Sequence, residues 1–261
     1  MTATTTPALD RPAPTGVQPP SLVTLTRVEL RKSRDTRAGR WLLLIIALAA
    51  LVVVALQLFV DDAPKSFDSF FGFTQLPIGI LLPVLGILLV TSEWSQRSAM
   101  TTFSLVPRRS RVLVAKVLAA TVLAVLAVVA SLCAAALGTL LIPVFTDGVM
   151  EWGVTGAQLG QVLLVQIINV LAGVALGMLL LNSPLAIVLY FVLPTVFTIL
   201  VNLVAALDWL SEWLDLTTTT APMYDGSLAG QGWAQLAASV ALWLVLPMAI
   251  GWWRIHRAEI A

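Results

Sequence analysis

Side chains able to do acid–base, nucleophilic or metal chemistry are few in this chain, and they lie far apart. Its single histidine, His256, lies between Arg254 and Arg257, and its single cysteine, Cys133, lies within a long apolar stretch. This count excludes a disulfide framework and an ordinary Cys/His metal site. Hydrolysis inside a membrane needs paired carboxylates, a Ser–His couple or metal ligands. We therefore predict that the chain is not an enzyme and has no catalytic, cofactor-binding or metal-binding residues.

The charged residues are balanced in number but segregated along the chain. Lys and Arg number 15, Asp and Glu number 14, and the net charge is +1. That balance excludes recruitment of nucleic acid by overall charge. All of these residues fall in tails, in loops or at the ends of apolar stretches. Because ion-coupled carriers usually keep ionisable groups at membrane depth, we predict that the chain has no proton-driven engine of its own.

The composition is that of an integral membrane protein. Hydrophobic residues make up 59% of the 261 positions and charged residues 11%, against roughly 45–50% and about 25% in soluble domains. A helix needs about 20 apolar residues to cross the roughly 30 Å hydrocarbon core. We predict an all-α, polytopic protein with six transmembrane helices, at about residues 41–60, 70–90, 112–145, 162–181, 185–207 and 234–253.

The segments outside the spans indicate one helical hairpin and one tail. The fourth and fifth spans are separated only by Asn182, Ser183 and Pro184, which predicts an antiparallel helical hairpin. Residues 1–20 are rich in Thr, Ala and Pro, have one acid and one base, and are predicted to be a disordered cytosolic tail. Residues 21–261 then form one membrane domain.

Basic residues mark one side of the membrane. They precede the first span, fill the loop between the second and third spans, and follow the sixth span, whereas the alternate loops are mainly acidic. By the positive-inside rule, both termini face the cytoplasm of a multi-pass protein in the cell membrane. The basic residues concerned are Arg27, Arg31, Lys32, Arg34, Arg37 and Arg40; Arg97, Arg108, Arg109, Arg111 and Lys116; and Arg254 and Arg257.

Residues 21–40 mix apolar side chains with six bases just before the first span. This pattern predicts an amphipathic helix on the inner membrane surface, with a plain juxtamembrane basic segment as the alternative. In the loop between spans two and three, Ala99 to Val106 alternate small, hydroxylated and hydrophobic side chains, and Pro107 ends that segment before a cluster of bases. A short amphipathic helix presented to the cytosol in this way is a docking element.

Two other segments, one in the fifth span and one in the last outer loop, have side-chain patterns that suggest a surface with a function. Thr195, Thr198 and Asn202 are spaced by three and four residues, so they share one helical face. That face is a candidate substrate path or, with equal weight, a packing surface. In the outer segment Asp208 to Gly232, tryptophan and leucine recur at helical spacing, which predicts a short surface helix ended by a run of threonines and Pro222.

The combined layout resembles the type-2 permease subunits of ATP-binding-cassette (ABC) exporters, over about residues 21–261. Members of that family have six spans, an N-terminal elbow helix, and a loop after the second span that reads Glu, Thr, a hydrophobic stretch, Pro, Ser-Arg and Lys. The matching positions are Glu93, Thr101 or Thr102, Phe103 to Val106, Pro107, Ser110 with Arg111, and Lys116. The glycine that often precedes the Thr in the family is replaced here by Met100 or Thr101.

The resemblance implies that this loop docks into a groove on a separate ABC ATPase subunit, and that the elbow helix, with Arg31, Lys32, Arg34 and Arg37, contacts the same subunit. ATP and Mg belong to that partner, since the chain has no phosphate-binding Gly-x-x-x-x-Gly-Lys-Ser/Thr motif. A second permease subunit completes the path, in a homo- or heterodimer. The residues that the resemblance assigns to ATPase coupling are Glu93, Arg97, Thr101, Thr102, Phe103, Leu105, Pro107, Arg108, Arg109, Arg111 and Lys116.

The expected function is export of a small hydrophobic or amphipathic compound, such as a drug, an antibiotic or a lipid-like molecule, because a charge-free path desolvates ionic substrates at high cost. Two alternatives stay open. One is a non-transporting immunity or signalling subunit that binds a toxin or peptide outside, over the surface from Trp209 to Trp233. The other is a sodium-coupled carrier, which can bind its ion through carbonyls and hydroxyls.

Overall fold

The computed structural model describes residues 20–60, 63–95, 108–204 and 207–257. Within these ranges the chain is helical and has no strand, and six helical segments are long and apolar enough to cross a membrane. The predicted all-α class and number of spans are therefore confirmed. The six are α2 (Arg37–Phe59), α3 (Phe67–Ser95), α5 (Arg109–Phe145), α6 (Gly156–Leu180), α7 (Ser183–Leu203), and the segment Gly232–Arg257, which comprises α10 (Gly232–Val240), the π-helical turn η3 (Ala241–Val245) and α11 (Leu246–Arg257).

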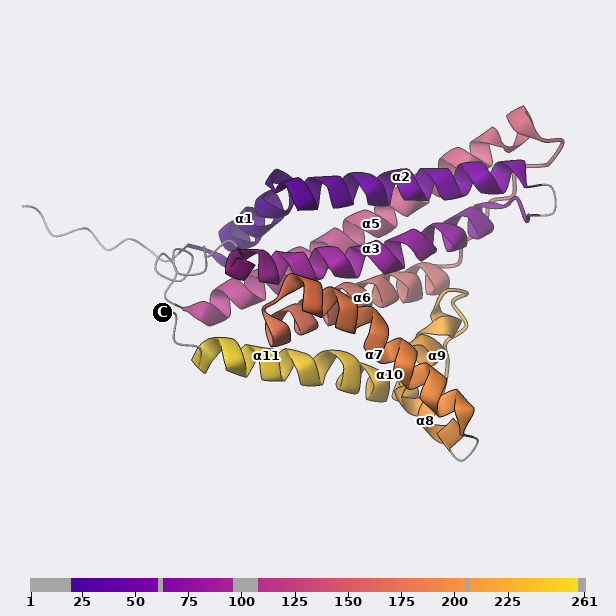
Figure 1. The fold of residues 1–261 in the computed structure, drawn as a ribbon. Coiled ribbons are helices and arrows are strands. Elements are labelled where there is room, and N and C mark those ends of the chain that lie inside the picture. The colour runs from indigo at the N-terminus through magenta and orange to yellow at the C-terminus, as the bar shows by residue number, and fades with distance from the viewer. Residues whose placement is uncertain (1–19, 61–62, 96–107, 205–206, 258–261) are drawn as a thin grey trace, which may run out of the picture.

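The helices α3, α5 and α6 lie at the centre of the bundle (Figure 1). Each has more than half of its most apolar stretch buried, whereas for α2, α7 and the last span the buried share is 28% or less. Close packing of α3 on α6 depends on two glycines. A Cβ atom on Gly86 would lie 2.5 Å from the Val170 carbonyl oxygen, and one on Gly173 would overlap the Pro83 carbonyl. Small residues at such crossings let helix backbones approach each other in a membrane.

A short helix, α1 (Leu22–Asp35), precedes the first span. The predicted segment 21–40 is not one helix, because the chain turns at Thr36 and Arg37 already belongs to α2. The Thr36 hydroxyl accepts a hydrogen bond from the Gly39 amide at 3.2 Å, so Thr36 is the N-cap of α2. The turn is tight enough that a Cβ atom on Gly39 would overlap the Ser33 carbonyl. Hydrophobic pattern alone does not reveal this break.

The opposite end of the bundle has short helices: α8 (Asp208–Leu214), α9 (Leu216–Thr220) and the 3-10 turn η2 (Ala221–Met223). The predicted helix around Trp209 is present as α8, but the expectation that the threonines end it was wrong. Asp215 separates α8 from α9 and accepts a 2.8 Å hydrogen bond from the Thr217 amide as the N-cap of α9. This cap offsets the low helix propensity of threonine.

Candidate functional site

Four charged side chains meet where α1 packs against the end of α3 and the start of α5. They are Glu29 and Lys32 of α1, Glu93 of α3 and Lys116 of α5, and we call them the charge cluster. The Lys116 ammonium lies 2.7 Å from Glu29 Oε2 and 3.3 Å from Glu93 Oε2. The Lys32 ammonium lies 2.9 Å from Glu29 Oε1 and 2.7 Å from Glu93 Oε1. Each ammonium therefore bridges both carboxylates, and the cluster has no net charge.

Most of this cluster is inside the protein. Lys116 is 2% exposed, Glu29 4% and Glu93 5%. Lys116 also donates a 2.8 Å hydrogen bond to the Leu89 carbonyl of α3. Burying a charge costs several kcal/mol unless partners satisfy it, and here each buried charge has two opposite charges. The cluster is therefore stable only when all three helices are in contact.

The local sequence explains how the cluster forms. Glu29 and Lys32 are three residues apart, so they project from the same face of α1. Glu93 lies in the last turn of α3 and Lys116 two turns into α5. Because α3 and α5 lie side by side at this end (Figure 1), both side chains meet that face of α1.

The environment of Lys32 changes its acidity. Partial burial by itself lowers the pKa of Lys32, but attraction by Glu29 and Glu93 and hydrogen bonds to their carboxylates outweigh it, so the pKa lies above the usual 10.5. Lys32 is therefore an ammonium ion at neutral pH. It is also the outermost member of the cluster, with 41% of its side chain exposed.

The predicted coupling residues separate into three groups. Arg97, Thr101, Thr102, Phe103, Leu105 and Pro107 lie outside the described residues, as does the helix expected at 99–106. Glu93 and Lys116 are in the buried charge cluster. Arg108, Arg109 and Arg111 are at the start of α5, where Arg109 donates a 2.7 Å hydrogen bond to the Ile255 carbonyl of α11. The structure thus brings Glu93 and Lys116 together and places the three arginines nearer the surface.

Among the predicted elbow residues, Lys32 is in the cluster, while Arg31 and Arg34 lie 3.2 Å and 4.0 Å from Asp35 on the exposed face of α1. Arg37 is exposed in the first turn of α2. The sequence reasoning did not find Glu29. The available signal was an acid three residues before a lysine in an otherwise basic segment, a spacing that forms ion pairs on helices.

Neutral polar side chains join the central helices at membrane depth. Gln75 of α3 donates a 3.1 Å hydrogen bond to the Ser131 hydroxyl of α5, and Gln166 of α6 donates one of 3.1 Å to Gln75 Oε1. Sequence analysis identified neither Gln75 nor Ser131. Such bonds contribute about 0.6–2 kcal/mol each in membranes, so this network fixes how the helices pack.

The candidate substrate path on α7 does not contribute to the cavity between α1, α2, α3 and α5 or to the smaller one beside Glu29 and Lys32. Thr195 and Asn202 are exposed and donate hydrogen bonds to the carbonyls of Phe191 and Thr198 in their own helix, at 2.6 Å and 2.8 Å. Thr198 donates a 2.7 Å hydrogen bond to the Asp215 carboxylate. The three residues do share one face, and most of α7 is exposed.

No protein-family model matches this chain, and no curated protein matches it at a significant level. Among the described residues, no group of three His, Cys, Asp or Glu side chains could hold a metal ion. The family relationship therefore stays a prediction from layout and motif.

Proposed function

We propose that this chain is the membrane-spanning permease subunit of an ATP-driven ABC exporter. It moves a hydrophobic or amphipathic compound across the cytoplasmic membrane, and a separate ATPase subunit supplies the energy. The observation that supports this proposal best is the charge cluster. It joins α1 to the two helices that flank residues 96–107, the segment that resembles the ATPase-docking loop of these exporters.

The cluster gives a physical route for coupling. A force applied to residues 96–107 acts on the end of α3 and the start of α5, which the cluster holds to α1. Arg109 extends the same connection to α11 through the Ile255 carbonyl. Moving α1 or α11 independently of this hairpin would break buried ion pairs or hydrogen bonds, so the four helices should move together.

The arrangement of the ends supports the proposed topology. The start of α2, the end of α3, the start of α5 and the end of α11 lie at one end of the bundle (Figure 1). Apart from Lys65, the basic residues of the described chain lie at that end, on α1, at the starts of α2 and α5 and at the end of α11. By the positive-inside rule this end faces the cytoplasm, with α1 as the elbow helix.

The exposed apolar face of α7 supports a paired assembly. Thr195 and Asn202 are exposed on that helix among apolar residues. Polar side chains lie more favourably against another polypeptide than against lipid tails. We propose that this face of α7 contacts a second permease subunit, and that the substrate path forms between the two subunits.

The test is reconstitution of the chain with ABC ATPase subunits from the same genome. In the variant Arg108→Glu/Arg111→Glu, substrate-stimulated ATPase activity should fall at least tenfold while membrane insertion is unchanged, because the reversed charges repel the docking surface. Arg109 is left intact because it holds α11. The control is Lys65→Glu, a charge reversal in the connection between α2 and α3 at the opposite end of the bundle.

Unchanged stimulation in the double variant would contradict a docking role for this end of the bundle. Directional transport by the purified chain alone, in liposomes without nucleotide, would contradict the proposal as a whole. That second result under a sodium gradient would favour the carrier alternative.

A further inference from the structure

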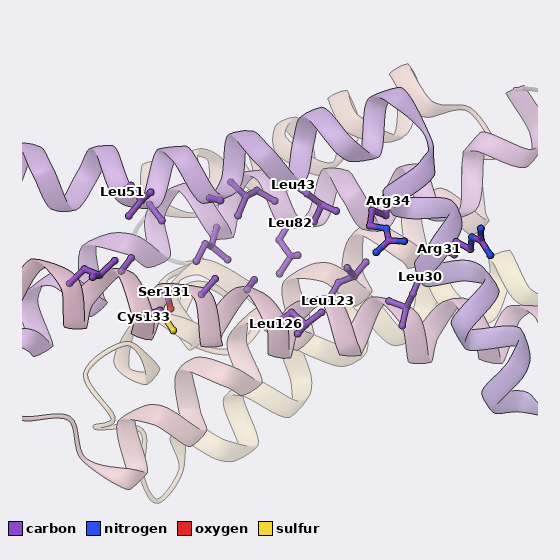
Figure 2. A pocket seen from close by; sticks show the side chains of 18 of the residues that line it. Leu30, Arg31, Arg34, Leu43, Leu51, Leu82, Leu123, Leu126, Ser131 and Cys133 are labelled. Atoms are coloured by element: carbon purple, nitrogen blue, oxygen red, sulfur yellow. The ribbon is translucent and has the colours of Figure 1, made fainter.

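A cavity of about 690 Å³ lies between α1, α2, α3 and α5. Figure 2 shows that leucines from these helices form its walls and that Arg31 and Arg34 of α1 lie at one end. Its volume is within the range of small-molecule sites, about 300–1,000 Å³. The lining is apolar along most of its length and basic at that end, so the site is amphipathic. The leucines of the wall include Leu43, Leu51, Leu82, Leu123, Leu126 and Leu137.

The basic end is made by one face of α1. Arg27, Arg31 and Arg34 all line the cavity and are spaced by four and three residues, so their side chains share a face. At about 100° per residue, Glu29, Lys32 and Ser33 lie on the opposite face. That second face is the one that packs against α3 and α5 in the charge cluster. The helix α1 thus has one face for the bundle and one for the cavity.

Charge at this end is not neutralised within the described residues. Arg31 and Arg34 lie within 4.0 Å of the same carboxylate, Asp35, and Arg27 has no carboxylate within that distance in the part of the chain that the structure describes. Three guanidinium groups facing one carboxylate leave an excess of positive charge. Arginine forks match phosphate oxygens in geometry as well as in charge. The basic end therefore fits a phosphate group.

The apolar part is longer than the hydrocarbon of one membrane leaflet is deep, and it opens sideways. On α5 the wall from Leu123 to Leu137 is about 21 Å long at about 1.5 Å per residue, more than half of the roughly 30 Å hydrocarbon core. Leu51, Leu126 and Leu137 are 45%, 55% and 53% exposed, so the walls continue onto the surface that contacts lipid. A lipid tail can enter from the bilayer without crossing the protein.

We propose that this cavity binds an anionic glycerophospholipid from the cytosolic leaflet. Its phosphate lies against Arg27, Arg31 and Arg34, and an acyl chain lies along α5 between α2 and α3. The leaflet follows from the proposed orientation, but binding itself requires no ATPase partner. A zwitterionic lipid has no net charge to complement the arginines, and a cationic amphiphile is repelled by them. Basic pockets between helices at the cytoplasmic membrane surface are recognised sites for anionic lipid headgroups.

The test uses the purified full chain in detergent, titrated with palmitoyl-oleoyl phosphatidylglycerol and observed by native mass spectrometry. The first phosphatidylglycerol should bind at least tenfold more tightly than palmitoyl-oleoyl phosphatidylcholine. Each arginine near an anionic headgroup raises the affinity for the lipid about fivefold. The double variant Arg27→Gln/Arg34→Gln should therefore bind phosphatidylglycerol about 30-fold more weakly. The matched control, Arg37→Gln/Arg40→Gln, removes two arginines at the same end that do not line the cavity and should bind like the original chain.

A second variant tests the apolar part separately. Ala130→Phe adds a ring to an exposed position in the wall and should weaken binding at least tenfold with all arginines present. Equal affinity for the two lipids, or equal losses in the Gln variant and its control, would overturn the proposal. The proposal would also be overturned if inorganic phosphate displaced bound phosphatidylglycerol as effectively as free phosphatidylglycerol does. It would be overturned too if Ala130→Phe dissociated a dimer of the chain but left lipid binding unchanged, because a second copy of the chain would then be the occupant of the apolar part. None of these outcomes depends on transport.

Discussion

Replacing Lys116 with methionine is the most direct perturbation of the charge cluster. The substitution keeps much of the side-chain volume but removes an ammonium that is 2% exposed and contacts Glu29, Glu93 and the Leu89 carbonyl. The two carboxylates then face each other with only Lys32, which is partly exposed to solvent. The variant therefore leaves the charge cluster with a buried excess negative charge.

The magnitude follows from the distances. At an effective dielectric constant of about 20, opposite charges about 3 Å apart attract by about 5–6 kcal/mol. Desolvation of the ammonium, several kcal/mol, offsets much of this attraction. Breaking a buried ion pair by removing one partner costs about 3–5 kcal/mol, and we expect Lys116→Met to lower the free energy of unfolding by that amount. In the Lys116→Met variant, we expect α1 to separate from the hairpin of α3 and α5 at a lower denaturant concentration than the one that unfolds the rest of the bundle.

Two assays read out the effect. Chemical unfolding of the purified chain in detergent measures the loss of stability. Limited trypsin digestion measures how readily α1 opens, because trypsin cleaves after its arginines only where the helix backbone is locally unfolded. The rescue variant Lys116→Met/Glu29→Gln restores a cluster of no net charge and should recover more than half of the lost stability. A loss below about 1 kcal/mol, or a double variant no more stable than the single one, would refute the reasoning that buried charge pairing holds α1 in place.

Two other predictions test the cluster and the packing beneath it. Because the pKa of Lys32 lies above 10.5 in the folded protein, its protonated form contributes stability below that value, and the contribution is lost as pH rises through the raised pKa. The difference in unfolding free energy between the original chain and Lys32→Met should therefore be constant near neutral pH and shrink above about pH 10.5; a difference that stays constant at pH 12 would contradict it. Gly173→Leu should destabilise the chain by about 1–3 kcal/mol, because the side chain meets the Pro83 backbone. Gly160→Leu, where nothing lies within 4 Å of the added Cβ, should change thermal stability little, and equal losses in the two variants would refute this account of α3–α6 contact.

Sequence alone identified the six spans because hydrophobic length is a local property that each span carries independently. It could not identify the charge cluster, because Lys116 and Glu29 are 87 residues apart and their pairing depends on how α1 lies across α3 and α5. Composition predicted charge at that end of the bundle but not its burial. The break at Thr36 and the helical threonines of α9 were missed for a different reason. Both depend on a single side chain that caps a helix, and a cap changes no hydrophobic pattern.

The two faces of α1 connect the proposed lipid site to the proposed coupling. Two short ion pairs, Lys32–Glu93 and Glu29–Lys116, hold one face of α1 to α3 and α5. Arg27, Arg31 and Arg34 line the cavity from the other face. A rotation of α1 about its axis that moved the arginines out of the cavity would also pull Glu29 away from Lys116. Since that contact is buried, such a rotation is costly on its own and needs a simultaneous shift of α3 and α5. Lipid occupancy and the position of the hairpin formed by α3 and α5 should therefore be linked, because each fixes the angle of the same helix.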